Sequence, residues 1–150
     1  MNHVLVADAS VAIKWVLPEV WSLQAQALLE QALHAHQRIV APPHLFSEAT
    51  NALHQRVHSR EAQHRITAPE AAEALVQFLT FPIEPIFSLS LYQHALRFAE
   101  VHGLRSIYDT LYVVLAEQVD AEMWTADKNL VNALTTSAPW VRFIGDFSPS

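Results

Sequence analysis

The stretch VLVADAS, residues 4–10, joins an apolar run to an acidic residue that directly follows it. A short apolar run of this kind is typical of a buried strand, and Asp8 stands where the chain leaves that strand. The stretch MWTAD, residues 123–127, has the same arrangement and ends on Asp127. If both strands belong to one parallel sheet, their two carboxylates meet at its carboxyl edge. Open α/β sheets place their functional sites at that edge.

Strand and helix patterns alternate along the rest of the chain. Strands are expected at residues 3–7, 38–41, 83–87, 122–125 and 141–144. Helices are expected at residues 10–16, 21–34, 44–60, from 67 onward, 91–102, 106–119 and 128–134. The helix from residue 67 opens with a capping-box pattern, Thr67 to Glu70, and Gly103 follows residues 91–102 as a natural C′ residue, which usually has a left-handed conformation. The alternation predicts an α/β fold, a three-layer α/β/α sandwich with a mostly parallel central sheet of about five short strands. Residues 1–150 are expected to form a single domain, since no linker or internal repeat divides them.

The composition is that of a packed globular protein, with 51% hydrophobic and 16% charged residues. The absence of cysteine excludes disulfides and a thiolate zinc site. We see neither a signal peptide nor an apolar run long enough to span a bilayer, so we expect a soluble, cytoplasmic protein without a membrane partner. The net charge of −6 argues against a broadly basic nucleic-acid surface. Net charge does not describe a single cleft, however, and a bound metal ion would cancel part of it locally.

Two further acids lie in predicted helices. Glu48 shares a polar stripe with His44 and Asn51, which on its own favours a solvated helix face. Asp109 ends the pattern Ser-Ile-Tyr-Asp, residues 106–109, which matches a capping box with Asp in place of Glu. The helix behind Asp109 is apolar nearly all round and is therefore expected to be central.

Each strand-end acid also has an ordinary structural interpretation. Asp8 and Asp127 could simply cap the helices that follow them. Ser10 and Thr125 could support either a cap or a ligand carboxylate, because Ser10 follows Asp8 closely and Thr125 lies two residues before Asp127. Four carboxylates brought together without basic partners repel one another, however, and such a cluster usually implies a divalent cation.

Four blocks occur in order along the chain and together carry a family resemblance: VADASVAIKWVLPE (6–19), SEATNAL (47–53), YDTLYVVLAE (108–117) and WTADKNL (124–130). Their arrangement resembles the PIN-domain ribonucleases, and within them the VapC-type toxins of bacterial toxin–antitoxin pairs. The resemblance implies a metal-dependent endoribonuclease that hydrolyses RNA and leaves 5′-phosphate and 3′-hydroxyl ends. It further implies an antitoxin protein that occupies the cleft, and a homodimer.

The resemblance also implies which residues act. The residues that hold Mg²⁺ or Mn²⁺ and perform catalysis are then Asp8, Glu48, Asp109 and Asp127, with Ser10, Asn51 and Thr125 in supporting positions. One departure concerns the turn before residues 122–125, where the family commonly has glycine and this chain has Asp120. That turn is expected to need a left-handed conformation, which Asp tolerates at some cost.

Two other functions remain open on the sequence. A phosphoryl-transfer or receiver-type domain also uses acids at a sheet edge, but it needs adjacent acids or Asp-x-Asp after the first strand, whereas this chain has Asp8-Ala-Ser10. A non-catalytic interaction module would use all four acids as caps. His54, His58 and Glu61 share a helix face at ligand-like spacing, and an exposed polar face is the favoured interpretation because nothing fixes a further ligand.

Overall fold

The computed structural model describes residues 3–150, and their five strands form one sheet. The strands are β1 (Val4–Ala7), β2 (Arg38–Ala41), β3 (Ile83–Pro85), β4 (Glu122–Thr125) and β5 (Val141–Phe143). Their order across the sheet is β3-β2-β1-β4-β5, and every neighbouring pair is parallel. The predicted α/β architecture with a parallel sheet of five short strands is therefore confirmed.

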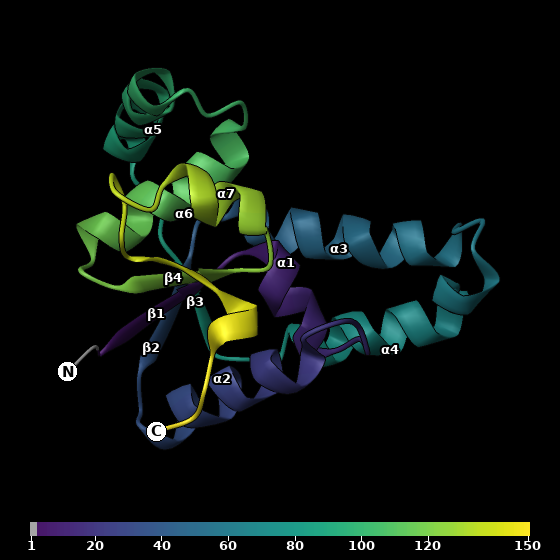
Figure 1. The fold of residues 1–150 in the computed structure, drawn as a ribbon. Helices are drawn as coiled ribbons and strands as arrows, with labels where there is room; N and C mark the ends of the chain where they lie inside the picture. The colour runs from purple at the N-terminus through teal and green to yellow at the C-terminus, as the bar shows by residue number, and fades with distance from the viewer. Residues whose placement is uncertain (1–2) are drawn as a thin grey trace.

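The α-helices of the described chain are α1 (Ala9–Ala12), α2 (Ser22–His34), α3 (His44–Val57), α4 (Ala68–Phe78), α5 (Leu89–His102), α6 (Ile107–Gln118) and α7 (Lys128–Ala133). Short 3-10 turns lie at η1 (Ile13–Trp15), η2 (Ala62–His64) and η3 (Ile144–Asp146). Figure 1 shows α5 and α6 on one side of the sheet and α2 on the other. Helices α3 and α4 pack together as a hairpin that extends away from the sheet.

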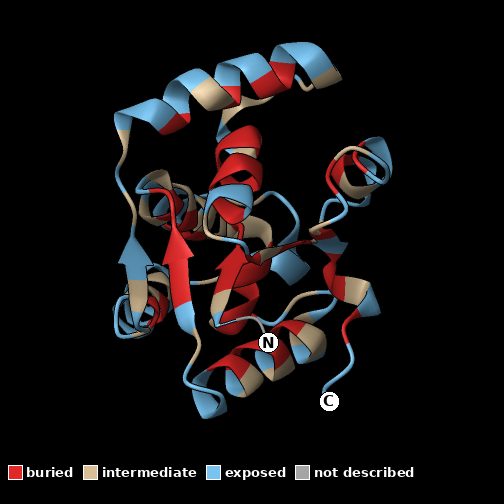
Figure 2. Ribbon diagram, turned by 90° about the vertical axis from the view of Figure 1, so that its left-hand side faces the viewer, coloured by how far each residue is buried: buried red, intermediate tan, exposed pale blue. Residues whose placement is uncertain are grey.

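The core lies between the sheet and its helices. Strands β1, β2 and β4 are buried over most of their length, whereas the edge strand β3 is largely exposed (Figure 2). Helix α6 is buried without interruption from residue 110 to residue 116, as its apolar sequence predicts. No helix among residues 3–150 has the length and hydropathy that a bilayer-spanning segment needs.

Several element ends differ from the prediction. The expected helix at residues 10–16 is a single α-turn that continues as η1. Helix α3 ends at Val57 rather than at residue 60, because the chain turns back and the Ile66 amide donates to the carbonyl of Arg56. Strand β3 stops at Pro85 and not at residue 87, although the amide of Ile86 still donates to the carbonyl of Ala41 at 2.9 Å.

Two predicted turn conformations are confirmed. Gly103 follows α5 with φ of 67°, and Asp120 precedes β4 with φ of 52°. The second value explains why a glycine suits that turn and why an L-residue there is strained. The predicted capping box at the start of α4 is also present, since Thr67 and Glu70 exchange hydrogen bonds.

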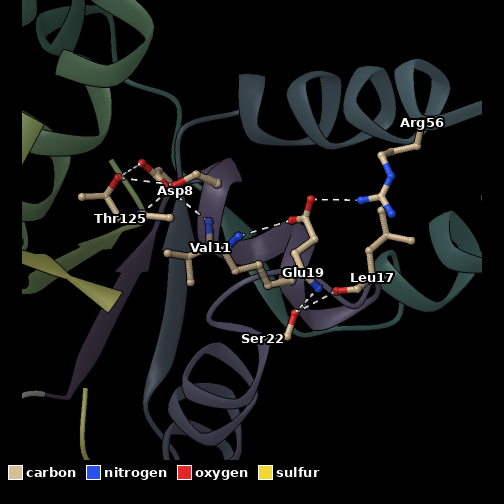
Figure 3. Close-up of polar contacts among 10 residues, drawn as sticks. Asp8, Val11, Leu17, Glu19, Ser22, Arg56 and Thr125 are labelled. Carbon is tan, nitrogen blue, oxygen red and sulfur yellow. Dashed lines mark hydrogen bonds and ion pairs between the residues drawn. The ribbon is translucent and has the colours of Figure 1, made fainter. Parts of the chain in front are cut away.

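The loop between η1 and α2 is fastened to α3 by one carboxylate. Glu19 accepts from Lys14 Nζ at 3.3 Å and from Arg56 Nη1 at 3.0 Å (Figure 3). The Lys14 side chain is only 10% exposed, so its ion pair with Glu19 is largely shielded from solvent. The ion pairs hold the segment that follows Asp8 against the hairpin of α3 and α4.

Candidate active site

The strand order places the site at the carboxyl edge, between β1 and β4. The chain leaves β1 toward β2 and β3 and later returns to β4 on the other side of β1, which makes this a topological switch point. Ala7 pairs with Trp124, and the Asp8 amide donates to the Trp124 carbonyl at 3.1 Å. Asp8 therefore lies beside Thr125, although the two are 117 positions apart in the chain.

Asp8 is buried, with 5% of its surface exposed, and both carboxylate oxygens accept hydrogen bonds. Ser10 Oγ and the Val11 amide donate to Oδ1 at 2.5 and 3.2 Å, and Thr125 Oγ1 donates to Oδ2 at 2.5 Å (Figure 3). The bond from Val11 caps α1, so the ordinary interpretation of Asp8 as a cap is also correct. Each carboxylate oxygen has two lone pairs, so Val11 and Ser10 together fill Oδ1, whereas Oδ2 accepts from Thr125 and keeps one lone pair for a ligand.

The two hydroxyl groups around Asp8 are themselves fixed by backbone amides. Ser10 Oγ accepts from the Ala126 amide at 2.9 Å, and Thr125 Oγ1 accepts from the Asp127 amide at 3.1 Å. Each hydroxyl oxygen thus faces an amide, and its own hydrogen is free to point at the carboxylate. This network joins the end of β1 to the end of β4 and holds the Asp8 carboxylate in one orientation.

The pKa of Asp8 is raised from 3.8 to about 6. Burial is the main cause, and the negative charge of Asp109 adds to it. The hydrogen bonds from Ser10, Thr125 and Val11 act in the opposite direction because they stabilise the charged form. The Asp8 carboxylate therefore lies at a buried position that disfavours its charged form.

Asp109 lies in the first turn of α6, where the hydroxyl of Ser106 accepts from its amide at 3.2 Å. The pKa of Asp109 is raised by burial and then by the charges of Glu48 and Asp127, while Ser106 and His44 oppose the shift. Acids from α3, α6 and the end of β4 thus act on one another electrostatically. Segments that lie far apart in the sequence share one negative region.

Glu48 projects from α3 toward α6. Its Oε1 accepts from the Tyr112 hydroxyl at 2.7 Å and lies 3.3 Å from His44 Nε2. Asp127 is exposed and caps α7, because its Oδ1 accepts from the Leu130 amide at 3.1 Å. In both residues the second carboxylate oxygen makes no hydrogen bond to the part of the chain that the structure describes.

The family model described as PIN domain matches residues 5–133, a span that includes all four acids. The chain belongs to the PIN domain family. PIN domains are generally nucleases, so membership indicates hydrolysis of a nucleic-acid backbone. A search among curated proteins gave no match.

The donor set of this PIN domain fits a hard divalent cation by its chemistry. All the candidate ligands are carboxylates, and within residues 3–150 no Lys or Arg forms an ion pair with any of them. In the same residues, no three acidic or histidine side chains lie close enough to form one complete ligand shell. Mg²⁺ retains several waters and is usually bound through only one or two protein carboxylates, so spaced acids suit it.

Asn51, the third predicted supporting residue, is exposed one turn beyond Glu48 and makes no hydrogen bond to the four acids among the described residues. The sequence reasoning missed Tyr112, which lies one turn after Asp109 on α6. Its i, i+3 spacing from Asp109 was the available signal, but the apolar residues around it pointed only to the core.

Proposed function

We propose that this PIN domain is a metal-dependent endoribonuclease and the toxin of a toxin–antitoxin pair. One observation carries the proposal: the buried Asp8 carboxylate is held by two hydroxyls at the switch point, close enough to Asp109 for their charges to interact. A fold does not gain stability from gathering such charges, and a cation is the usual compensation.

The residues that would hold Mg²⁺ or Mn²⁺ are Asp8, Glu48, Asp109 and Asp127. When bound, the ion supplies charge neutralisation at the phosphate and a bound water of lowered pKa. Ser10 and Thr125 fix the direction of Asp8 through the network at the strand ends. No single carboxylate is assigned as general base, because coupled acids titrate as a group.

The partners are proposed together with the toxin role. The substrate is RNA, and the cognate antitoxin is a protein that covers the four acids. Because these acids carry negative charge, that antitoxin is expected to place a basic side chain, such as Arg, against them. The toxin itself is proposed to act as a homodimer.

The test is cleavage of a mixed RNA pool by the purified protein in Mg²⁺ or Mn²⁺. Wild type should cleave internally, and Asp8→Asn and Asp109→Asn should each lose about 100-fold or more of the rate, comparable with the loss of one transition-state charge group. Asp146→Asn, an exposed aspartate outside the site, is the control. Activity that survives both site substitutions would remove the ribonuclease assignment. Folded wild type that neither cleaves RNA nor responds to metal would favour a non-catalytic interaction module.

The toxin role needs its own experiment. Induced expression of wild type in a bacterial host should arrest growth, and co-expression of the small protein encoded beside its gene should relieve the arrest. Asp109→Asn, expressed at the same level, should be harmless. Equal growth arrest by wild type and Asp109→Asn would show that toxicity does not depend on nuclease activity.

A further inference from the structure

We infer that Tyr112 is a positioning residue for Glu48, which its hydroxyl holds in one orientation for metal binding. The inference rests on the proposed function, because it assigns Glu48 to the ion. It adds a residue to the site that neither the sequence pattern nor the family match assigns.

Tyr112 is placed to give a fixed hydrogen bond. It is 1% exposed in the middle of the buried part of α6, and its hydroxyl donates to Glu48 Oε1 at 2.7 Å. A glutamate on a helix surface has three rotatable side-chain bonds, so its carboxylate is free to sweep over a wide area. A donor on a rigid buried ring removes most of that freedom.

His44 lies near the same oxygen from within α3, while the hydrogen bond of its Nε2 goes to the carbonyl of Tyr108. Its Nε2 lies 3.3 Å from Glu48 Oε1 and 3.1 Å from the carbonyl oxygen of Tyr108. The His44 ring packs edge-on against the ring of Tyr112, with 4.9 Å between centroids. Two groups from two helices therefore converge on Oε1.

The consequence is that Oε2 of Glu48 makes no hydrogen bond to residues 3–150. One oxygen of the carboxylate is occupied by positioning contacts and the other is left for a ligand. This division is the usual pattern for outer-shell partners of metal-binding carboxylates. Tyr112 also shares α6 with Asp109, one turn away, so one helix carries an acid of the site and the donor that orients another.

The experiment compares Tyr112→Phe, which keeps the ring and removes the hydroxyl, with Tyr92→Phe on α5, which is partly exposed and outside the site. Mn²⁺ binding is measured by calorimetry or by the electron paramagnetic resonance signal of free Mn²⁺, without RNA. Tyr112→Phe should weaken Mn²⁺ binding by about 10–100-fold, the usual effect of removing an outer-shell partner. Tyr92→Phe should bind as wild type does. His44→Phe, which keeps an aromatic ring, should weaken binding in the same direction and serves as a second variant.

A double-mutant cycle separates positioning from general destabilisation. In a Glu48→Gln background, Tyr112→Phe should cause no further loss of Mn²⁺ affinity. The inference is overturned if Tyr112→Phe binds Mn²⁺ as wild type does, or if its loss is the same with and without Glu48. Failure of the proposed function looks different, because wild type itself would then neither bind Mn²⁺ nor cleave RNA.

Discussion

Replacing Asp8 with Asn should stabilise the metal-free protein at high pH and not at low pH. The pKa of Asp8 is 3.8 in the unfolded chain and about 6 in the folded one. The folded state therefore binds more protons between these values, and stability that is present below 3.8 is lost as the pH rises through about 6. Above that range, the buried carboxylate weakens the fold and its removal should strengthen it.

The magnitude follows from the shift. A rise of about two pKa units corresponds to about 3 kcal/mol of lost stability at pH 8. Solvent screening does not reduce this value much, because Asp8 is 5% exposed. The Asn side chain keeps one oxygen that can accept a hydrogen bond. Its NH₂ group faces a hydroxyl that donates to Asp8 in wild type, and the loss of that hydrogen bond costs about 1 kcal/mol. The net expectation is stabilisation by about 2 kcal/mol at pH 8 and destabilisation by about 1 kcal/mol at pH 4.

The assay is urea unfolding in EDTA at pH 4 and pH 8, followed by fluorescence of the tryptophans. Asp146→Asn is the control for replacing an exposed aspartate, and its effect should be small at both pH values. Burial does not destabilise the charged Asp8 if Asp8→Asn changes the free energy of unfolding by the same amount at both pH values, or if Asp8→Asn is the less stable protein at pH 8.

Three further outcomes are expected. Thr125→Val removes a donor and an acceptor from the buried network around Asp8. It should lower the free energy of unfolding at pH 8 by about 1–3 kcal/mol in urea titrations, and an unchanged midpoint would argue against the network. Glu19→Gln leaves the charges of Lys14 and Arg56 without their shared partner. It should lower the free energy of unfolding by about 2 kcal/mol in the same assay, and an unchanged value would show that the ion pairs do not stabilise the fold. Mn²⁺ at about 100 times its Kd should stabilise wild type by about 2.7 kcal/mol in thermal melts, and EDTA should reverse the gain. Asp109→Asn should show much less of this gain, and an equal response from both proteins would place the ion elsewhere.

The features that the sequence predicted are those set by local physics. An apolar run followed by an acid marks both β1 and β4: β1 ends at Ala7, directly before Asp8, and β4 ends at Thr125, two residues before Asp127. The capping box at Thr67 and the left-handed Gly103 depend only on neighbouring residues and were predicted for that reason. Alternation of strands with helices was sufficient to predict the parallel sheet.

The features that the sequence did not predict depend on contacts between distant segments. Tyr112 belongs to an apolar helix, and nothing nearby reveals that its hydroxyl reaches Glu48, which is 64 positions away. The end of α3 at Val57 is set by a hydrogen bond from Ile66, not by a helix-breaking residue. Asn51 shares a polar stripe with Glu48, and the stripe alone does not reveal that Asn51 is exposed and makes no hydrogen bond to the acids among residues 3–150.

The most direct test of the acidic site is anomalous diffraction from crystals of the protein soaked in Mn²⁺. We expect a manganese peak at the carboxyl edge of the sheet, with Asp8 and Asp109 among its ligands or hydrogen-bonded to its waters. Well-diffracting crystals with manganese only at other positions, or with none at millimolar Mn²⁺, would show that these acids are not a metal site.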